Sequence, residues 1–421
     1  MAKQPVRAAS NQPALPEIVM GMRYVARQPI LDLRGRVHGY ELLFRAGPEA
    51  AFRGDGDMAT RTMLDNAVIF GLERLSGGLP AFVNCTLEAL TENLVEVLPP
   101  SMTVLEVLET LEPVPKLIGA CRKLKDDGYR LALDDFTWAT KFAPLVELAD
   151  YIKVDFTLSS VQERQSLLKR MQGTTVTMIA EKVETLEEFN IACQEGFTLF
   201  QGYYFCRPFL LENKKIPSNR ISHIEILQLL HSDEIDFRKL TSALKRDTSL
   251  TYRLLRLVNS PVYAMRQRVR SIEAALIAVG EDAFRRIAML AITCELNSDQ
   301  PMEILRMAFI RGRFCELAAG LCSLNSTEQY LLGMLSLLPV MLHVPMVTLV
   351  RELPLSDQVR EALQGSANTE GILLRWVENH ERGAWAACDA EAQAHGLQQV
   401  DLALYYTESV IWAEDALGGT H

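Results

Sequence analysis

Hydrophobic positions along the chain follow two different periods. From about residue 24 to 210, short β-branched or apolar runs alternate with amphipathic stretches. After about residue 220, nearly all apolar positions recur at the spacing of an α-helix. This change of period predicts two domains, and a length of 421 residues agrees with that number.

The first region has the pattern of an α/β barrel. Asp32–Arg36, which contains Gly35, separates the first two apolar runs and predicts a hairpin. Gly128 and Gly196 stand where two of the later helices should end. The predicted strands are 25–30, 37–44, 80–84, 102–106, 130–134, 151–154, 176–180 and 198–201, and the predicted helices are 57–75, 86–96, 114–126, 157–170 and 185–195. Eight strands alternating with helices predict a TIM-like barrel, and the hairpin makes its first strand antiparallel.

The second region is predicted to be all-α. Its expected helices are 222–231, 236–246, 249–258, 271–279, 282–296, 302–322, 327–342, 357–364, 369–380 and 399–416. The polar segment 211–220, which carries Pro217, predicts a linker between the domains. Residues 1–23 are rich in Pro and Ala and lack periodicity, so we expect a flexible tail there. The expected domains are therefore a barrel over 24–210 and a helical domain over 221–421.

Composition is that of a globular protein, with 48% hydrophobic and 23% charged residues. A formal net charge of −10 argues against a nucleic-acid-binding surface. The eight cysteines form no C-x-x-C pair, so we expect buried free thiols rather than disulfides or zinc. No apolar run reaches membrane-spanning length and no hydrophobic signal core is present, so a cytoplasmic protein without membrane contact is expected.

Acidic or amide side chains stand at the end of nearly every predicted strand after the first. A single residue of this kind is more often a helix cap or a solvated loop residue. A series of them is different, because barrel strand ends converge on one rim and clustered carboxylates need compensating cations. Oxygen ligands favour Mg²⁺ or Mn²⁺, and a metal pair is a common device for phosphodiester hydrolysis. The residues are Glu41, Asn84, Glu106, Asp134 with Asp135, Lys153 with Asp155, Glu181 and Gln201.

The segments around these residues resemble the EAL domain family, whose members hydrolyse or merely bind the bacterial second messenger cyclic di-GMP. The matching segments are 40–45 (YELLFR), 82–85 (FVNC), 105–110 (LEVLET), 133–136 (LDDF), 152–155 (IKVD), 179–184 (IAEKVE) and 201–208 (QGYYFCRP). The spacing between Glu181 and Gln201 agrees with the family pattern as well. The resemblance covers about residues 24–210.

The resemblance implies a role for each matching position. Metal ligands would be Glu41, Asn84, Glu106 and Asp134, with Asp135 reaching a second Mg²⁺ or Mn²⁺ ion. The catalytic residues would be Glu181, Lys153, which positions the attacking water, and Gln201 near the nucleophile. Arg45, Leu43 and Asp155 would contact the substrate, and Glu109 would support the loop after the Asp-Asp pair.

Three departures from the family pattern leave the activity open. The signature triplet is Glu41-Leu-Leu43 rather than Glu-Ala-Leu. The loop 136–142 (FTWATKF) lacks both glycines of the family pattern, and Lys182 replaces a glycine. Two hypotheses remain. One is a metal-dependent phosphodiesterase that opens cyclic di-GMP to the linear dinucleotide. The other is a non-catalytic cyclic di-GMP receptor or protein-interaction scaffold.

The helical region resembles the HDOD domain family, which is similar to the metal-dependent HD fold without its metal ligands. The resemblance rests on 247–260 (DTSLTYRLLRLVNS) and 269–280 (VRSIEAALIAVG). Ser336 and Leu337 stand where a His-Asp pair would bind metal, and His343 is interpreted as structural. We therefore expect a regulatory module that docks a protein partner, and the barrel resemblance allows a homodimer.

Overall fold

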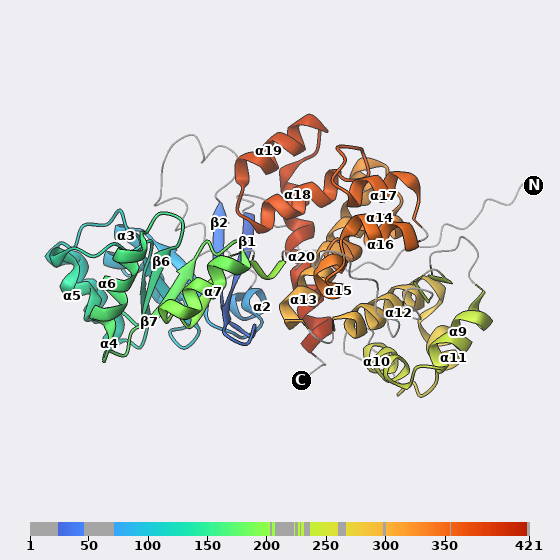
Figure 1. Cartoon of the computed structure of the whole chain (residues 1–421), viewed down its shortest axis with the longest axis horizontal. Helices are drawn as coiled ribbons and strands as arrows, with labels where there is room; N and C mark the ends of the chain where they lie inside the picture. Colours follow the sequence, from blue (N-terminus) through green and yellow to red (C-terminus); the bar gives the residue numbers. More distant parts are fainter. Residues whose placement is uncertain are drawn as a thin grey trace, which may run out of the picture.

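The computed structural model describes most of both predicted domains (Figure 1). The described residues are 24–45, 71–202, 204–206, 236–259, 267–297, 300–353 and 355–418, with His223, Ile226, Leu227, Leu229 and Leu230. The expected tail 1–23, the linker 211–220 and most of the expected helices 57–75 and 222–231 lie outside them.

Eight strands close into a barrel in sequence order. They are β1 (Tyr24–Asp32), β2 (Val37–Arg45), β3 (Ala81–Cys85), β4 (Thr103–Val107), β5 (Arg130–Leu133), β6 (Tyr151–Asp155), β7 (Thr177–Glu181) and β8 (Leu199–Gln201). β1 runs antiparallel to both β2 and β8, and all other neighbours are parallel. In the hairpin turn, the Asp32 carboxylate accepts bonds from the amides of Arg34 and Arg36, and Gly35 has a φ of 72°. The predicted barrel with an antiparallel first strand is confirmed.

Three of the described barrel helices, α3, α6 and α7, begin at a capping side chain. They are α2 (Leu72–Ser76), α3 (Leu87–Thr91), η3 (Leu94–Val97), α4 (Pro115–Asp126), η4 (Thr140–Phe142), α5 (Ala143–Val146), α6 (Val161–Met171), α7 (Leu186–Glu195) and η5 (Tyr204–Cys206). Ser160 with Glu163 and Thr185 with Glu188 form capping boxes, and Gly196 ends α7 in the left-handed conformation. The helix expected over 157–170 starts later, because 157–159 form a turn on the Asp155 carboxylate.

The second domain is helical throughout its described residues. Its helices are α9 (Phe237–Lys245), α10 (Thr248–Val258), α11 (Ile272–Val279), α12 (Glu281–Leu296), α13 (Met302–Ala318), η7 (Ala319–Cys322), α14 (Ser326–Leu335), α15 (Leu338–Leu342), α16 (Met346–Glu352), α17 (Asp357–Leu363), α18 (Ile372–Glu381), α19 (Trp385–Ala394) and α20 (Gln399–Gly418). The single helix expected over 327–342 is wrong. It breaks between Leu335 and Leu338, because Pro339 has no amide hydrogen and begins a new helix. The sequence pattern did not predict α16 and α19.

The two domains pack directly against each other through the β1–β2 hairpin (Figure 1). The Tyr40 hydroxyl donates a 2.7 Å hydrogen bond to the Glu303 carboxylate of α13. Arg27 pairs with Glu414 of α20 at 2.8 Å. Leu31 of β1 lies within the hydrophobic core of the helical domain. The β1–β2 hairpin of the barrel is therefore also the surface on which α13, α18 and α20 dock.

Within the residues that the structure describes, no helix is both long and apolar enough to cross a membrane.

Candidate active site

A buried lysine lies among the strand-end carboxylates. Lys153 of β6 is 1% exposed, and its ammonium forms ion pairs with carboxylates from four other positions of the barrel. The distances from Lys153 Nζ are 2.7 Å to Glu106 Oε1, 2.7 Å to Glu181 Oε1, 2.9 Å to Asp134 Oδ1 and 3.1 Å to Glu41 Oε2. The structure thus brings together around Lys153 four of the six acidic residues that the strand-end pattern singled out.

One ammonium cannot neutralise four buried carboxylates, and the pKa values reflect this. Burial, and then the charge of Glu41, raises the pKa of Glu106 well above its usual range. Burial raises the pKa of Glu181 to about 8, although Lys153 opposes the shift. Burial lowers the pKa of Lys153, but the surrounding carboxylates outweigh it and the net pKa is raised. The cluster therefore retains protons at neutral pH, and additional positive charge would displace them.

Two amide side chains bind Glu41 and distinguish it from the other carboxylates. Gln201 Nε2 donates to Glu41 Oε2 at 2.6 Å, and Asn84 Nδ2 donates to Glu41 Oε1 at 2.9 Å. Burial alone would raise the pKa of Glu41, but Lys153 and these amides lower it. Gln201 also donates to Gln28 Oε1 at 3.0 Å. The sequence pattern did not predict Gln28, although its place opposite Glu41 in the β1–β2 register follows from the hairpin.

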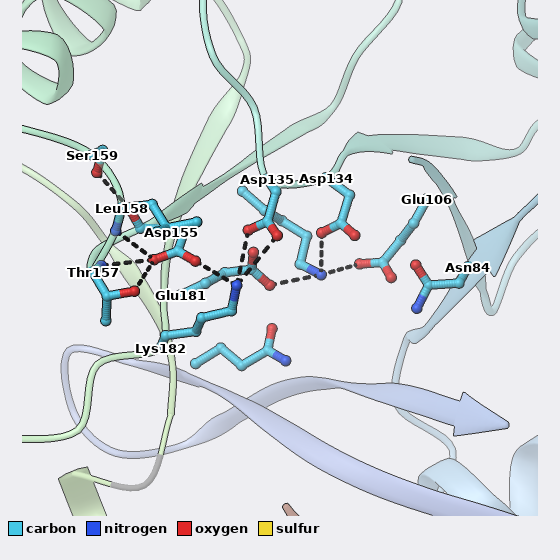
Figure 2. Close-up of polar contacts among 12 residues, drawn as sticks. Asn84, Glu106, Asp134, Asp135, Asp155, Thr157, Leu158, Ser159, Glu181 and Lys182 are labelled. Carbon is cyan, nitrogen blue, oxygen red and sulfur yellow. Dashed lines mark hydrogen bonds and ion pairs between the residues drawn. The ribbon is translucent and has the colours of Figure 1, made fainter. Parts of the chain in front are cut away.

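A second cation lies beside this cluster (Figure 2). Lys182 Nζ is 3.2 Å from Asp135 Oδ2 and also contacts the Asp155 carboxylate. The other Asp155 oxygen accepts amide hydrogen bonds from Thr157 and Leu158. Burial would raise the pKa of Asp155, but Lys182 and these donors lower it. The contacts of Asp155 are therefore with its own loop and with Lys182.

The backbone at Lys182 and Asp135 is left-handed, with φ of 56° and 39°. For a residue with a Cβ this conformation costs about 1 kcal/mol relative to glycine. The lysine at the glycine position of the family pattern therefore keeps the backbone conformation of a glycine and adds a cation. In the sequence, the only sign of the contact between Lys182 and Asp135 was that a lysine replaces the glycine of the family pattern.

An open cavity of about 610 Å³ gives access to the cluster. From the barrel it is lined by Gln28, Glu41, Leu43, Asp134, Asp135, Lys153, Glu181, Lys182, Glu184, Gln201 and Gly202, and from the helical domain by Arg311, Ser336, Leu337, Glu378 and Arg382. Glu106 is fully buried beneath this cavity. The sequence pattern did not predict the helical wall, because nothing in the linear sequence relates these residues to the barrel rim.

Two predicted residues stand apart from the cluster. Glu109 is exposed and lines a separate cavity of about 260 Å³ with Asp135 and Thr137, beside the altered loop. Arg45 is the last residue of β2, and its side chain lies outside the described part of the structure.

The donor atoms of the cluster are suited to Mg²⁺ or Mn²⁺. Glu106 Oε2 and Asn84 Oδ1 are buried and have no hydrogen-bond partner among the described residues. Both are hard oxygen donors, which these ions prefer. As arranged, however, no three acidic, His or Cys side chains in the described ranges are spaced to hold a metal ion, and the carboxylates converge on Lys153 instead. The donor types therefore fit a divalent ion, whereas their present arrangement fits the Lys153 ammonium.

Both halves of the chain match known protein families. The EAL domain model matches residues 83–208, and the HDOD domain model matches residues 216–352. The protein YuxH of Bacillus subtilis is 32% identical over 405 residues, which cover 94% of this chain and 98% of YuxH. The cyclic di-GMP phosphodiesterase CdgJ of Vibrio cholerae is 30% identical over 406 residues, which cover 95% of this chain and 94% of CdgJ. The chain belongs to the family of EAL-HDOD proteins.

Solved EAL structures are similar to the barrel half of this EAL-HDOD protein. The Klebsiella pneumoniae BlrP1 complex with calcium and cyclic di-GMP is 25% identical with a TM-score of 0.39, and covers 47% of this chain and 58% of its own. The Pseudomonas aeruginosa FimX EAL domain bound to cyclic di-GMP is 21% identical with a TM-score of 0.37, and covers 44% and 89%.

Proposed function

We propose that this EAL-HDOD protein is a metal-dependent phosphodiesterase that opens cyclic di-GMP to the linear dinucleotide. The observation that carries the proposal is the convergence of Glu41, Asp134 and Glu181 at one cavity that is open to solvent, with the buried Glu106 on the same ammonium. The cavity volume of about 610 Å³ is in the range of small-molecule sites. The relative CdgJ, which matches along nearly its whole length, is named a cyclic di-GMP phosphodiesterase.

Each side chain in the cluster has a role in this reaction. Glu41, Asn84, Glu106 and Asp134 would hold the first Mg²⁺ or Mn²⁺ ion, and Asp135 a second. A divalent ion bound there would neutralise phosphate charge and lower the pKa of a water molecule.

Hydrolysis adds water across one P–O bond, so the attacking water must lose a proton. Glu181 would accept that proton, because its carboxylate lines the same cavity as Glu41 and Asp134 and additional positive charge there would displace its own proton. Lys153 would hold the attacking water against the phosphate, and Gln201 would hydrogen-bond beside it. Leu43 lines the cavity and would contact the ligand, while Arg45 would bind a phosphate.

A specific observation favours a second candidate, a cyclic di-GMP receptor or scaffold without turnover. Lys182 binds Asp135 and Asp155 with its ammonium, and Asp135 is the residue assigned to the second ion. An ammonium in that position competes with a metal ion for the same carboxylate. Under this alternative, the barrel would bind cyclic di-GMP without hydrolysing it, and the helical domain would bind a protein partner.

A turnover assay on the full chain separates the two candidates. Purified protein with Mg²⁺ or Mn²⁺ should convert cyclic di-GMP to the linear dinucleotide, which chromatography resolves. Glu41→Ala should abolish conversion, while Glu187→Ala, at an exposed position of α7, should not change it. Absence of product with either metal would contradict the enzyme. In that case, calorimetric binding of cyclic di-GMP would support the receptor, and absence of binding would leave the scaffold.

A further inference from the structure

The helical domain forms one wall of the cavity that leads to the carboxylate cluster. Ser336 and Leu337 lie between α14 and α15, and Glu378 and Arg382 lie at the end of α18. The HDOD resemblance places Ser336 and Leu337 where an HD protein would carry its metal-binding pair. In this chain that face of the helical domain is turned toward the barrel cavity.

A buried arginine holds this wall together. Arg311 of α13 is 3% exposed, and its guanidinium donates to three side chains, two from α18 and one from the segment between α14 and α15. The distances are 2.7 Å to Glu381 Oε2, 3.0 Å to Glu378 Oε1 and 3.1 Å to Ser336 Oγ. Arg311 therefore holds α18 and the segment around Ser336 together through these hydrogen bonds.

Hydrogen bonds connect the wall to the carboxylate cluster. The carbonyl oxygen of Glu381 accepts from Gln28 Nε2 at 3.5 Å, a long contact. Gln28 Oε1 accepts from Gln201, and Gln201 donates to Glu41. His380 lies within hydrogen-bond distance of the Val25 carbonyl oxygen, 3.0 Å from it, and fixes α18 on β1. The end of α18 is therefore held at the rim of the barrel, where the Gln28 side chain connects Glu381 to Gln201.

We propose that this wall is part of the ligand-binding site, and that Arg382 binds a phosphate or guanine oxygen of the cyclic dinucleotide. This inference rests on the proposed cyclic di-GMP ligand. The barrel side of the cavity carries more carboxylates than cations, so an anionic ligand needs positive charge from elsewhere. Arg382 is exposed, borders the cavity from the opposite side, and presents the donor geometry that suits phosphate.

A ligand held in this way contacts both domains at once. Its affinity then depends on the position of α18, and by linkage its binding stabilises the docked arrangement of the domains. The helical domain would sense cyclic di-GMP through this direct contact.

The test measures cyclic di-GMP affinity by calorimetry on the full chain, with Ca²⁺ present as in the BlrP1 complex. The variants are Arg382→Ala and Arg382→Lys. The matched control is Arg246→Ala, at an exposed arginine that caps α9 of the same domain. Arg382→Ala should raise the Kd roughly tenfold or more, Arg382→Lys should raise it less, and Arg246→Ala should leave it unchanged.

Further readouts separate ligand contact from a structural role. The salt dependence of the Kd should become weaker in Arg382→Ala, which a purely structural role would not produce. Because Arg382 also acts on the charge of the buried Glu381, the unfolding temperature without ligand is measured for each variant, and the Kd should rise more in Arg382→Ala than any loss of stability explains. A Kd for Arg382→Ala within twofold of the parent would overturn the inference while leaving the proposed function standing. A parent protein that binds no cyclic di-GMP would overturn both.

Discussion

Replacing Lys153 by Met tests whether this ammonium is the counter-charge of the carboxylate cluster. Methionine is similar in length, so the substitution removes the charge while filling most of the volume. The parent has four carboxylate partners at 2.7–3.1 Å from a side chain that is 1% exposed. Without the ammonium, those carboxylates must take up protons, bind another cation or repel one another.

The expected loss of stability is about 3 kcal/mol at pH 7 without metal. Removing one partner of a buried ion pair costs about 3–5 kcal/mol. We expect the lower end, because Glu106 and Glu181 already have raised pKa values and accept protons readily. The loss should shrink at pH 5, where protonation relieves the repulsion. Mn²⁺ at about 100 times its Kd should restore about 2.7 kcal/mol.

Urea unfolding at pH 7 and pH 5, with and without Mn²⁺, measures these quantities. The control is Lys169→Met, at an exposed position of α6. Mn²⁺ should stabilise Lys153→Met more than the parent, because no ammonium then competes for the carboxylates. Equal stability of the variant and the parent at pH 7 without metal, or an equal gain from Mn²⁺, would refute this account of the cluster.

Three further substitutions test other parts of the structure. Lys182→Gly removes the strain of a positive φ at this position and frees Asp135 from the ammonium. Equilibrium dialysis should therefore find more Mn²⁺ bound per chain. An unchanged number would show that Lys182 does not compete with metal. Burial lowers the pKa of His380 from 6.5 to about 4, so the unfolded chain binds more protons between these values. Stability should therefore fall by about 3 kcal/mol as pH drops from 6.5 to 4, a decline that urea titrations of His380→Phe should lack. Tyr40→Phe should cost about 2 kcal/mol by calorimetry, since it removes a donor from the buried Glu303, and a loss below about 0.5 kcal/mol would contradict that pairing.

Most of the barrel could be predicted from the sequence because its determinants are local. Apolar runs, turn residues and capping boxes define each element, and strand order follows from alternation with helices. The gathering of Glu41, Glu106, Asp134 and Glu181 also follows, because barrel strand ends share one rim.

The remaining features depend on contacts between residues far apart in the chain. The contact of Lys182 with Asp135 requires the loop conformations after β5 and β7, which periodicity does not describe. The wall containing Arg382 requires the docking of α18 on β1, and no local pattern encodes that placement. Pro339 was a visible signal for the break in the helix expected over 327–342, but the continuous hydrophobic period obscured it.

The pairing of β1 has a consequence for the order in which the chain folds during synthesis. β1 can pair with β2 almost at once, but its other edge pairs with β8, which is made much later. Arg27 of β1 and Glu414 of α20 can meet only after all the residues between them have been synthesised. The β1–β2 hairpin therefore emerges from the ribosome long before β8 and α20 are available to cover it, and its apolar and charged side chains stay exposed to misfolding and aggregation during that interval.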